Sequence, residues 1–276
     1  AGDASAVFVN GTDIYIAGQD KNNQAAIWKN GTITTLTANA TYAEARSVFV
    51  LGSDVYATGH DDGDNDIAIV WKNGTLLHTL NDGMYPARAY SIFVDGQETY
   101  VAGYESNDSQ NNVAKIWKND TVFYTLSDEA NNAETRTVFV YGSDVYAAGQ
   151  EDVNGEYVAK VWKNGVATDL TDGTNYSDSR AVFVIGADVY AISEESTENG
   201  DMVKVWKNSA VLHELTNGNN LASAYGLFVI GTNVYSSGYE YEGDNSIAKV
   251  WKNGSLLYEL NSNESSSARV YSIYVK

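Results

Sequence analysis

Short apolar runs alternate with polar turns along the whole chain, and the pattern repeats. In each repeat the first run is apolar at nearly every position, as in "SVFVL" at residues 47–51, and a shorter run such as "DVYA" at 54–57 follows after a glycine-containing turn. A third run ends in Trp-Lys, and a fourth, such as "TLLHTL" at 75–80, comes directly after it. Runs of this length between turn residues predict four short β-strands in every repeat.

The link between the third and fourth predicted strands carries the most specific local signal. It is Asn-Gly in four repeats, at residues 30–31, 73–74, 164–165 and 253–254. A two-residue hairpin needs a positive φ at both central positions, which Asn and Gly adopt at low cost. Asn119-Asp120 and Asn208-Ser209 stand at the same place in the other two repeats. We therefore expect the same hairpin at all six places.

Two aromatic landmarks recur about every 45 residues, a period typical of four-stranded propeller blades when the repeat is rich in strands and turns. The tryptophans are Trp28, Trp71, Trp117, Trp162, Trp206 and Trp251, and the first-strand aromatics are Phe8, Phe49, Phe93, Phe139, Phe183, Phe228 and Tyr274. The sequence therefore predicts an all-β, six-bladed β-propeller with four antiparallel strands per blade, in a single domain over residues 1–276. We expect each tryptophan to be a wedge between blades.

The first strand has a seventh copy. "SAVFV" opens the chain and "YSIYVK" at 271–276 ends it, whereas the other three strands have six copies each. The surplus copy at 270–276 either completes the first blade in place of residues 1–10 or pairs elsewhere while residues 1–10 keep their place. Because an unpaired strand edge promotes association, we expect the C-terminal strand to close the propeller.

Charge and composition narrow the range of partners. The chain has 36 acidic and 17 basic residues and a formal net charge of −19, which repels phosphate backbones and anionic lipids. We therefore expect neither nucleic acid nor a membrane as a partner, and no apolar run approaches the ~20 residues of a membrane span. Cysteine is absent, which excludes disulfides, thiolate metal sites and cysteine nucleophiles.

Two sets of variable residues form the candidate binding site, because in a propeller the first strands start, and the second strands end, at one face around the channel mouth. The first set lies three residues before each first-strand aromatic and comprises Ser5, Arg46, Tyr90, Arg136, Arg180, Tyr225 and Tyr271. The second set follows the second strand and comprises Gln19, His60, Tyr104, Gln150, Glu194 and Tyr239. Side chains that stack and hydrogen-bond on a constant frame indicate recognition of a glycan or peptide. Structural ion pairs between the arginines and nearby acids are an equal alternative.

No cofactor is indicated. Asp62, Asp64 and Asp66 have the alternate-residue spacing of calcium ligands, but Ile67 stands where a calcium loop needs glycine, so an ordinary solvated loop is favoured over calcium. His60 and Glu194 are the base and acid of an alternative hydrolase or lyase hypothesis, for which no nucleophile is identified. The lysine after each tryptophan is interpreted as protection of a sheet edge.

The repeat pattern "VFVYGSDVYAAG" (138–149), "AKVWKNG" (159–165) and "LTDG" (170–173) resembles an uncharacterised family of secreted bacterial propellers with Trp-Lys-Asn-Gly repeats, and more loosely the NHL and kelch propellers. The resemblance covers all 276 residues. It implies an extracytoplasmic location and no established reaction. The chain lacks the Gly-Gly doublet of kelch and the Trp-Asp ending of WD repeats, so no functional residue is carried over from them.

We expect a non-enzymatic recognition or scaffold propeller that binds a glycan or a protein partner at the channel mouth, as a monomer or a strand-exchanged oligomer. The alternatives are a hydrolase or lyase and a structural protein for surface assembly.

Overall fold

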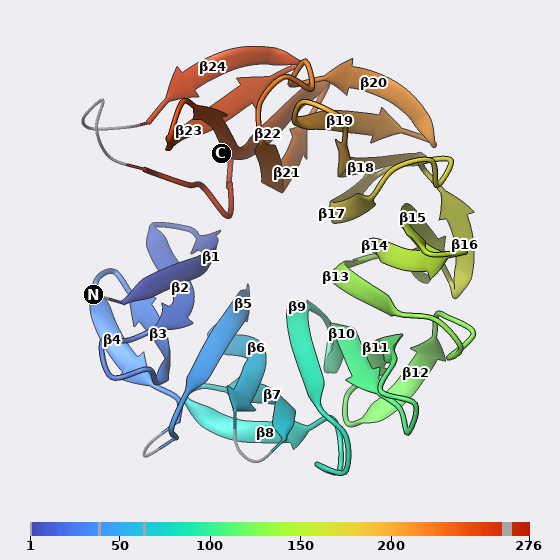
Figure 1. Ribbon diagram of the computed structural model, residues 1–276. Coiled ribbons are helices and arrows are strands. Elements are labelled where there is room, and N and C mark those ends of the chain that lie inside the picture. The colour runs from blue at the N-terminus through green and yellow to red at the C-terminus, as the bar shows by residue number, and fades with distance from the viewer. Residues whose placement is uncertain (1, 38–39, 63–64, 261–266) are drawn as a thin grey trace. The chain divides into compact units, whose positions relative to one another are not determined.

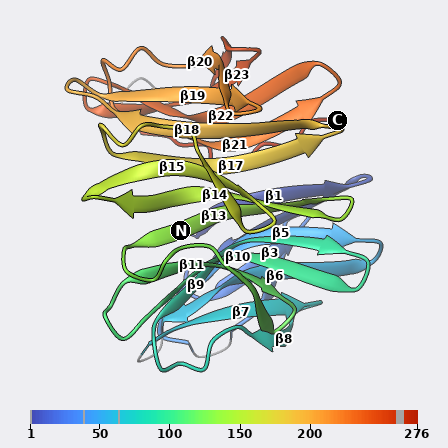
Figure 2. The ribbon, with the colours of Figure 1, turned by 90° about the vertical axis from the view of Figure 1, so that its right-hand side faces the viewer.

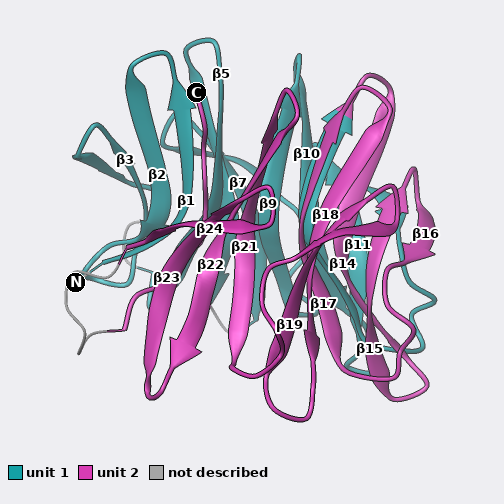
Figure 3. Ribbon diagram, turned by 90° about the horizontal axis from the view of Figure 1, so that it is seen from above, with its two compact units in different colours: residues 1–140 teal, residues 141–276 magenta. Residues whose placement is uncertain are grey.

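The structure is a computed structural model that describes residues 2–37, 40–62, 65–260 and 267–276. The described residues form β-strands grouped into six four-stranded antiparallel sheets, each built from four consecutive strands (Figure 1). The chain divides into two compact units, residues 1–140 and 141–276 (Figure 3). No helix long and apolar enough to cross a membrane occurs in the described ranges.

The first unit contains three complete sheets, in which the strands lie in chain order. The strands are β1 (Asp3–Asn10), β2 (Asp13–Gln19), β3 (Ala25–Lys29) and β4 (Thr32–Thr35); β5 (Ala43–Leu51), β6 (Asp54–Asp62), β7 (Asp66–Lys72) and β8 (Thr75–Thr79); and β9 (Ala87–Asp95), β10 (Glu98–Ser106), β11 (Asn112–Lys118) and β12 (Thr121–Thr125). Strand β13 (Ala133–Tyr141) follows and ends at the boundary between the units.

The second unit continues the same order. Its strands are β14 (Asp144–Val153), β15 (Glu156–Lys163) and β16 (Val166–Asp169); β17 (Ser177–Ile185), β18 (Asp188–Ser196), β19 (Asp201–Lys207) and β20 (Ala210–Glu214); and β21 (Ala222–Ile230), β22 (Asn233–Glu242), β23 (Asn245–Lys252) and β24 (Ser255–Glu259). Figure 2 shows β17, β18 and β19 side by side along their length. The predicted strands of every repeat are therefore confirmed.

The Asn-Gly hairpins are confirmed at what we call the turn end of the sheets, where β7 meets β8 and β5 meets β6. Asn73 and Gly74 have φ of 50° and 82°, the positive values that a two-residue hairpin needs. The Asn73 side chain accepts a hydrogen bond from the backbone N–H of Val55 at 2.8 Å and donates one to Asp54 at 2.9 Å. This asparagine therefore shapes one turn and fixes the start of the neighbouring strand.

The lysine of each repeat lies over an aromatic ring, and in the first five repeats it also pairs with an acid. Lys72 Nζ lies 2.8 Å from the Asp54 carboxylate and 5.0 Å from the ring centre of Tyr56. Hydrogen bonding between the pair lowers the pKa of Asp54 and raises the pKa of Lys72. The other sheets stack Lys29 on Tyr15, Lys118 on Tyr100, Lys163 on Tyr146, Lys207 on Tyr190 and Lys252 on Tyr235. The lysines therefore pack on the tyrosines of the neighbouring strand at the turn end. This packing is a role in addition to the predicted protection of sheet edges.

The core clusters confirm the predicted tryptophan wedge for Trp71 and Trp117. Trp71 packs in one cluster with Tyr15 and Ile27 of the preceding sheet, and Trp117 packs in another with Val70 of the sheet before it. These two indoles are 2% and 0% exposed. Neighbouring sheets are therefore packed face to face with a large aromatic side chain between them.

The first-strand aromatics also stack from sheet to sheet, and the C-terminal copy continues this stack. Phe228 of β21 lies 5.2 Å from Phe183 and 5.1 Å from Tyr274, measured between ring centres. Strand β1 keeps its place beside β2, while residues 267–276 are assigned to no strand. The expectation that the C-terminal copy replaces residues 1–10 was therefore wrong. Side-chain packing on β21 holds this copy in place.

Candidate functional site

Five of the seven residues in the first candidate set lie at β-bulges. In β5, Ala45 pairs with Gly59 and Ser47 pairs with Thr58, so Arg46 between them has no partner in β6. The same shift isolates Ser5, Tyr90, Arg180 and Tyr225 in their own first strands. A bulge removes one residue from the hydrogen-bonded ladder and re-aims its side chain. The bulge end of each sheet, opposite the turn end, thus presents one residue that ladder pairing does not constrain.

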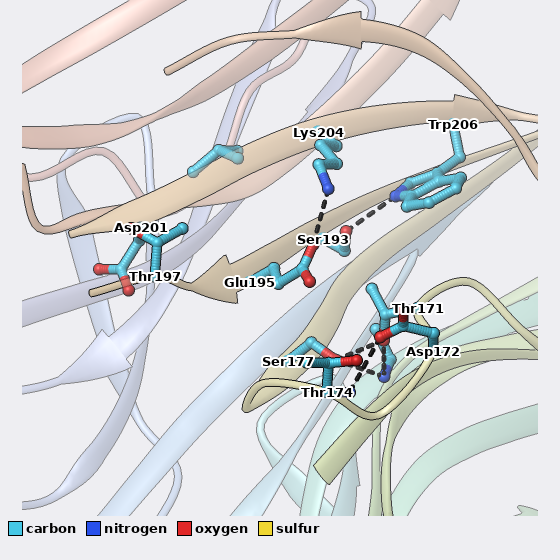
Figure 4. A network of polar contacts seen from close by, with 12 residues as sticks. Thr171, Asp172, Thr174, Ser177, Ser193, Glu195, Thr197, Asp201, Lys204 and Trp206 are labelled. Carbon is cyan, nitrogen blue, oxygen red and sulfur yellow. Dashed lines mark hydrogen bonds and ion pairs between the residues drawn. The ribbon is translucent and has the colours of Figure 1, made fainter. Parts of the chain in front are cut away.

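A glycine in the second strand makes room for the bulge. A Cβ atom on Gly59 would collide with the backbone oxygen of Glu44. Gly18, Gly103 and Gly238 are confined in the same way. The fifth sheet has Ser193 at this place, and its hydroxyl accepts a hydrogen bond from the Trp206 indole at 2.8 Å (Figure 4). The fifth sheet keeps its bulge at Arg180 with this side chain present, so the glycine is not required in every sheet. Where it recurs, it is the sequence signal that could have located the bulge.

In residues 1–140 the candidate arginines are paired with carboxylates. Arg46 lies 2.9 Å from Glu44, and Arg136 lies 2.6 Å from Glu134. The Arg136 guanidinium also lies 5.1 Å from the ring centre of Tyr90, within the range of a cation–π contact. The structural ion pairs that the sequence allowed as an alternative are therefore present.

Two tyrosines form the aromatic part of the site in this unit. The ring centres of Tyr90 and Tyr104 are 6.0 Å apart, and burial raises the pKa of both. Both phenols therefore stay protonated at neutral pH and can donate as well as accept hydrogen bonds.

His60 lies beneath this surface with no exposed area. Burial, together with the charges of Arg88 and Arg46, lowers the pKa of His60 to about 4, so the ring is neutral at pH 7. Its Nε2 is 3.3 Å from Asp62, and neither ring nitrogen has a hydrogen-bond partner among the described residues. A ligand at the surface cannot touch His60 in this structure.

The calcium candidates are only partly described, because Asp64 lies outside the described residues. Burial is the largest single influence on Asp66 and opposes its ionisation, but the 2.6 Å hydrogen bond from Arg88, a hydrogen bond with Asp62 and the positive charge of Arg88 together lower the pKa of Asp66. Burial and a hydrogen bond with Asp66 raise the pKa of Asp62 to about 6. Among the residues that the structure describes, no group of three or more His, Cys, Asp or Glu side chains is arranged to hold a metal ion.

In residues 141–276 five candidate residues come together in what we call the tyrosine cluster. Tyr225, the bulge residue of β21, has its ring centre 6.2 Å from that of Tyr239 and 5.0 Å from that of Tyr271. The guanidinium of Arg180 lies 5.0 Å from the Tyr225 ring centre and 2.5 Å from the Glu194 carboxylate. Burial is the largest cause of the raised pKa of Tyr239, so this phenol is protonated at neutral pH.

Two further residues complete the tyrosine cluster and were missed at the sequence level. The Arg269 guanidinium lies 4.6 Å from the ring centre of Tyr239 and donates a hydrogen bond to the Tyr241 hydroxyl at 3.1 Å. Arg269 stands two residues before Tyr271, the offset that separates Arg88 from Tyr90. Aligning the C-terminal copy with β9 on these two tyrosines would have identified Arg269 as a candidate residue.

Comparisons with known proteins place the chain by its fold. No protein-family model and no curated protein matches it. The structure of Drosophila Semaphorin 1a, extracellular domains 1-2, is similar with a TM-score of 0.55 at 10% identity, over 96% of this chain and 79% of that chain.

A Trypanosoma rangeli sialidase in complex with sialic acid is similar with a TM-score of 0.53 at 9% identity, over 91% of this chain and 54% of the sialidase, about half its length. At these identities the likeness shows the fold alone. Together with the six four-stranded sheets, it confirms the predicted six-bladed β-propeller.

Proposed function

We propose that this propeller is a non-enzymatic recognition module that binds a saccharide at the bulge end of its sheets. The observation that carries the proposal is the contrast between a repeated frame and a bulge residue that changes from sheet to sheet. Binding residues commonly vary on a rigid scaffold in this way. The tyrosine cluster is the best supported place, because it joins partly exposed aromatic rings to arginine side chains.

The chemistry of the tyrosine cluster suits a sugar ring. Tyr271 is 43% exposed and offers an aromatic face on which the C–H face of a pyranose can stack. The phenol hydroxyls both donate and accept hydrogen bonds, and the exposed Arg269 donates. Sugar hydroxyls need this mixture of donors and acceptors. One structural neighbour is described in complex with sialic acid, so the fold can carry a saccharide site, although no residue is carried over from it.

Catalysis and strand exchange have less support. His60 has no exposed surface, and the Glu194 carboxylate is engaged by Arg180, so neither hypothesised acid–base residue is free to meet a substrate. The surplus C-terminal copy packs on β21 of its own chain through Tyr274, which does not favour its exchange between chains.

The test is a glycan array and a peptide array, each probed with the wild type and three variants. We expect the wild type to bind a subset of glycans, and Tyr225→Ala and Tyr271→Ala to lose roughly tenfold or more in affinity, because each removes a stacking face. Tyr258→Ala is the matched control: Tyr258 is 58% exposed but lies on the outer strand β24, so binding should be unchanged.

Equal glycan binding by all four proteins would place the site elsewhere and contradict the proposal. Binding to peptides without any glycan would assign the surface to a protein partner. Melting temperatures of the variants check that each retains its fold.

A further inference from the structure

The C-terminal copy takes the position that a first strand has on the preceding sheet. Backbone N–H groups of the first strands in the third and fourth sheets donate at 3.3 Å to serines of the sheet before them, Ile92 to Ser47 and Val138 to Ser91. The sixth sheet has Gly226 in place of serine, and Ile273 N lies only 3.0 Å from where a Cβ of Gly226 would be. The sixth sheet is therefore shaped to receive this copy closely.

This docking brings two side chains of the C-terminal copy to the bulge end. Tyr271 stacks near Tyr225, and Arg269 lies over Tyr239 and donates to the hydroxyl of Tyr241. Arg269 is exposed, and its guanidinium carbon lies over the Tyr239 ring. A guanidinium has five N–H donors along its edge, so donors remain after the bond to Tyr241.

Arg269 differs from the other arginines in its electrostatic partners. The chain has five arginines, and Arg46, Arg88, Arg136 and Arg180 each lie within ion-pair distance of a carboxylate. Among the described residues no carboxylate lies within that distance of Arg269. Its positive charge is therefore available to a negatively charged group of a ligand, whereas the other four charges are already compensated.

The net charge of the chain limits how much negative charge such a ligand can carry. At −19 the long-range field repels a polyanion. A single carboxylate close to Arg269 can still form two parallel hydrogen bonds with the guanidinium, the strongest geometry for this pair. A saccharide with one uronate ring in an otherwise neutral chain satisfies both conditions.

We propose that Arg269 and Tyr271 of the C-terminal copy select a saccharide that carries one carboxylate, with the uronate carboxylate on Arg269 and its ring on Tyr271. This inference rests on the proposed saccharide-binding function and adds the class of saccharide. Arg269 is then the specificity-determining residue, and Tyr271 supplies affinity for both neutral and acidic forms.

The test uses an array that prints neutral oligosaccharides beside the same oligosaccharides with one uronate ring, followed by titration of cellobiose and cellobiouronic acid. We expect the wild type to bind uronate forms roughly tenfold more tightly. Arg269→Gln should bring this ratio close to one while neutral binding is largely kept, and Tyr271→Ala should weaken both forms alike. Raising NaCl from about 0.05 M to about 0.5 M should reduce the wild-type ratio.

Lys252→Gln is the matched control, because Lys252 is a cation that lies over Tyr235 at the turn end of the same sixth sheet, so its loss should leave the ratio unchanged. A wild-type ratio of one, or a preference that survives Arg269→Gln, would overturn the inference while saccharide binding still supported the proposed function. Absence of binding to every oligosaccharide would overturn both. Tighter binding of an acidic peptide than of any saccharide would show that the carboxylate comes from protein.

Discussion

The two ends of each sheet are built from the same repeat but behave differently. At the turn end, sheet after sheet places a lysine on a tyrosine, and in the second sheet Asn73 bonds both the backbone and an acid. At the bulge end the corresponding positions are Arg46 in one sheet and Tyr90 or Tyr225 in others. The frame is common, and the side chains vary more at the bulge end than at the turn end, where Asn233 replaces the acid in the sixth sheet.

Backbone hydrogen bonding accounts for this difference. Asn73 completes the hydrogen bonds of a neighbouring strand and must adopt a positive φ, so few residues can replace it. Arg46 lies outside the ladder, and Gly59, which pairs with the neighbouring Ala45, leaves room for the bulge. The pairing of the sheet therefore does not restrict which residue stands at position 46. Variation is tolerated where a side chain has no role in satisfying the backbone.

The largest expected effect separates the glycine that holds a bulge from a glycine in a turn. Gly59→Ala should lower the free energy of unfolding by about 3 kcal/mol or more, because the added Cβ collides with backbone that cannot move independently. Gly52→Ala places a Cβ in open space at φ +61° and should cost about 1 kcal/mol.

Urea denaturation measures both values. If Gly59→Ala does not accumulate as folded protein while Gly52→Ala does, the ranking is supported as well. Equal losses in the two variants would show that the bulge adapts to a side chain and that the glycine is not its cause.

The next effect is a pH dependence confined to the bulge end of the second sheet. The folded pKa of His60, about 4, lies below its ordinary value of 6.5, so its contribution to stability is present above pH 6.5 and is lost as pH falls toward 4. Asp62 has the opposite sign, because its folded pKa of about 6 lies above 3.8 and the folded chain binds the proton first. In the wild type the two contributions oppose each other between pH 4 and 6.

Replacing either His60 or Asp62 should reveal the pH dependence of stability that the other residue contributes. Asp62→Asn should lose up to about 3 kcal/mol of stability between pH 6.5 and 4, more than the wild type loses. His60→Gln should instead become more stable, relative to wild type, as pH falls through 6. Denaturation at several pH values measures the slopes, and parallel slopes for all three proteins would contradict the assignment.

The smallest effects belong to the turn end and separate asparagine from lysine. Asn73→Ala removes two hydrogen bonds and places alanine at a positive φ, so it should cost about 1–2 kcal/mol. Lys72→Ala removes an exposed ion pair that solvent screens, so it should cost less than Asn73→Ala. Melting curves measure the difference, and a larger loss for Lys72→Ala would mean that its packing on Tyr56 dominates the turn.

The sequence predicts the sheets well because each strand is specified locally. The Asn-Gly pairs and the apolar runs carry their own geometry, so strands such as β5–β8 follow from periodicity alone. The bulges are a property of register between two strands, and reading β5 by itself does not reveal that Arg46 is unpaired. Their position still follows from the glycine across the pair, once two strands are compared.

The candidate site was predicted in outline, and its electrostatics were not. Arg180, Glu194 and the tyrosines were expected near one another, and the structure brings them into the tyrosine cluster. Burial of His60 and the charge of Arg88 beside it depend on packing between elements, which no pattern within a single repeat encodes. The pairing of Arg46 with Glu44 has a local signal, because an acid stands two residues before the arginine here and again at Glu134 and Arg136.

Because the bulge residue takes no part in the hydrogen-bonded ladder, its side chain can be replaced without changing the strands. Randomising Arg46, Tyr90 and Tyr225 while retaining the glycines opposite them would yield a library in which every member keeps the same strand register. Selection from such a library would change what the surface captures without rebuilding the sheets beneath it.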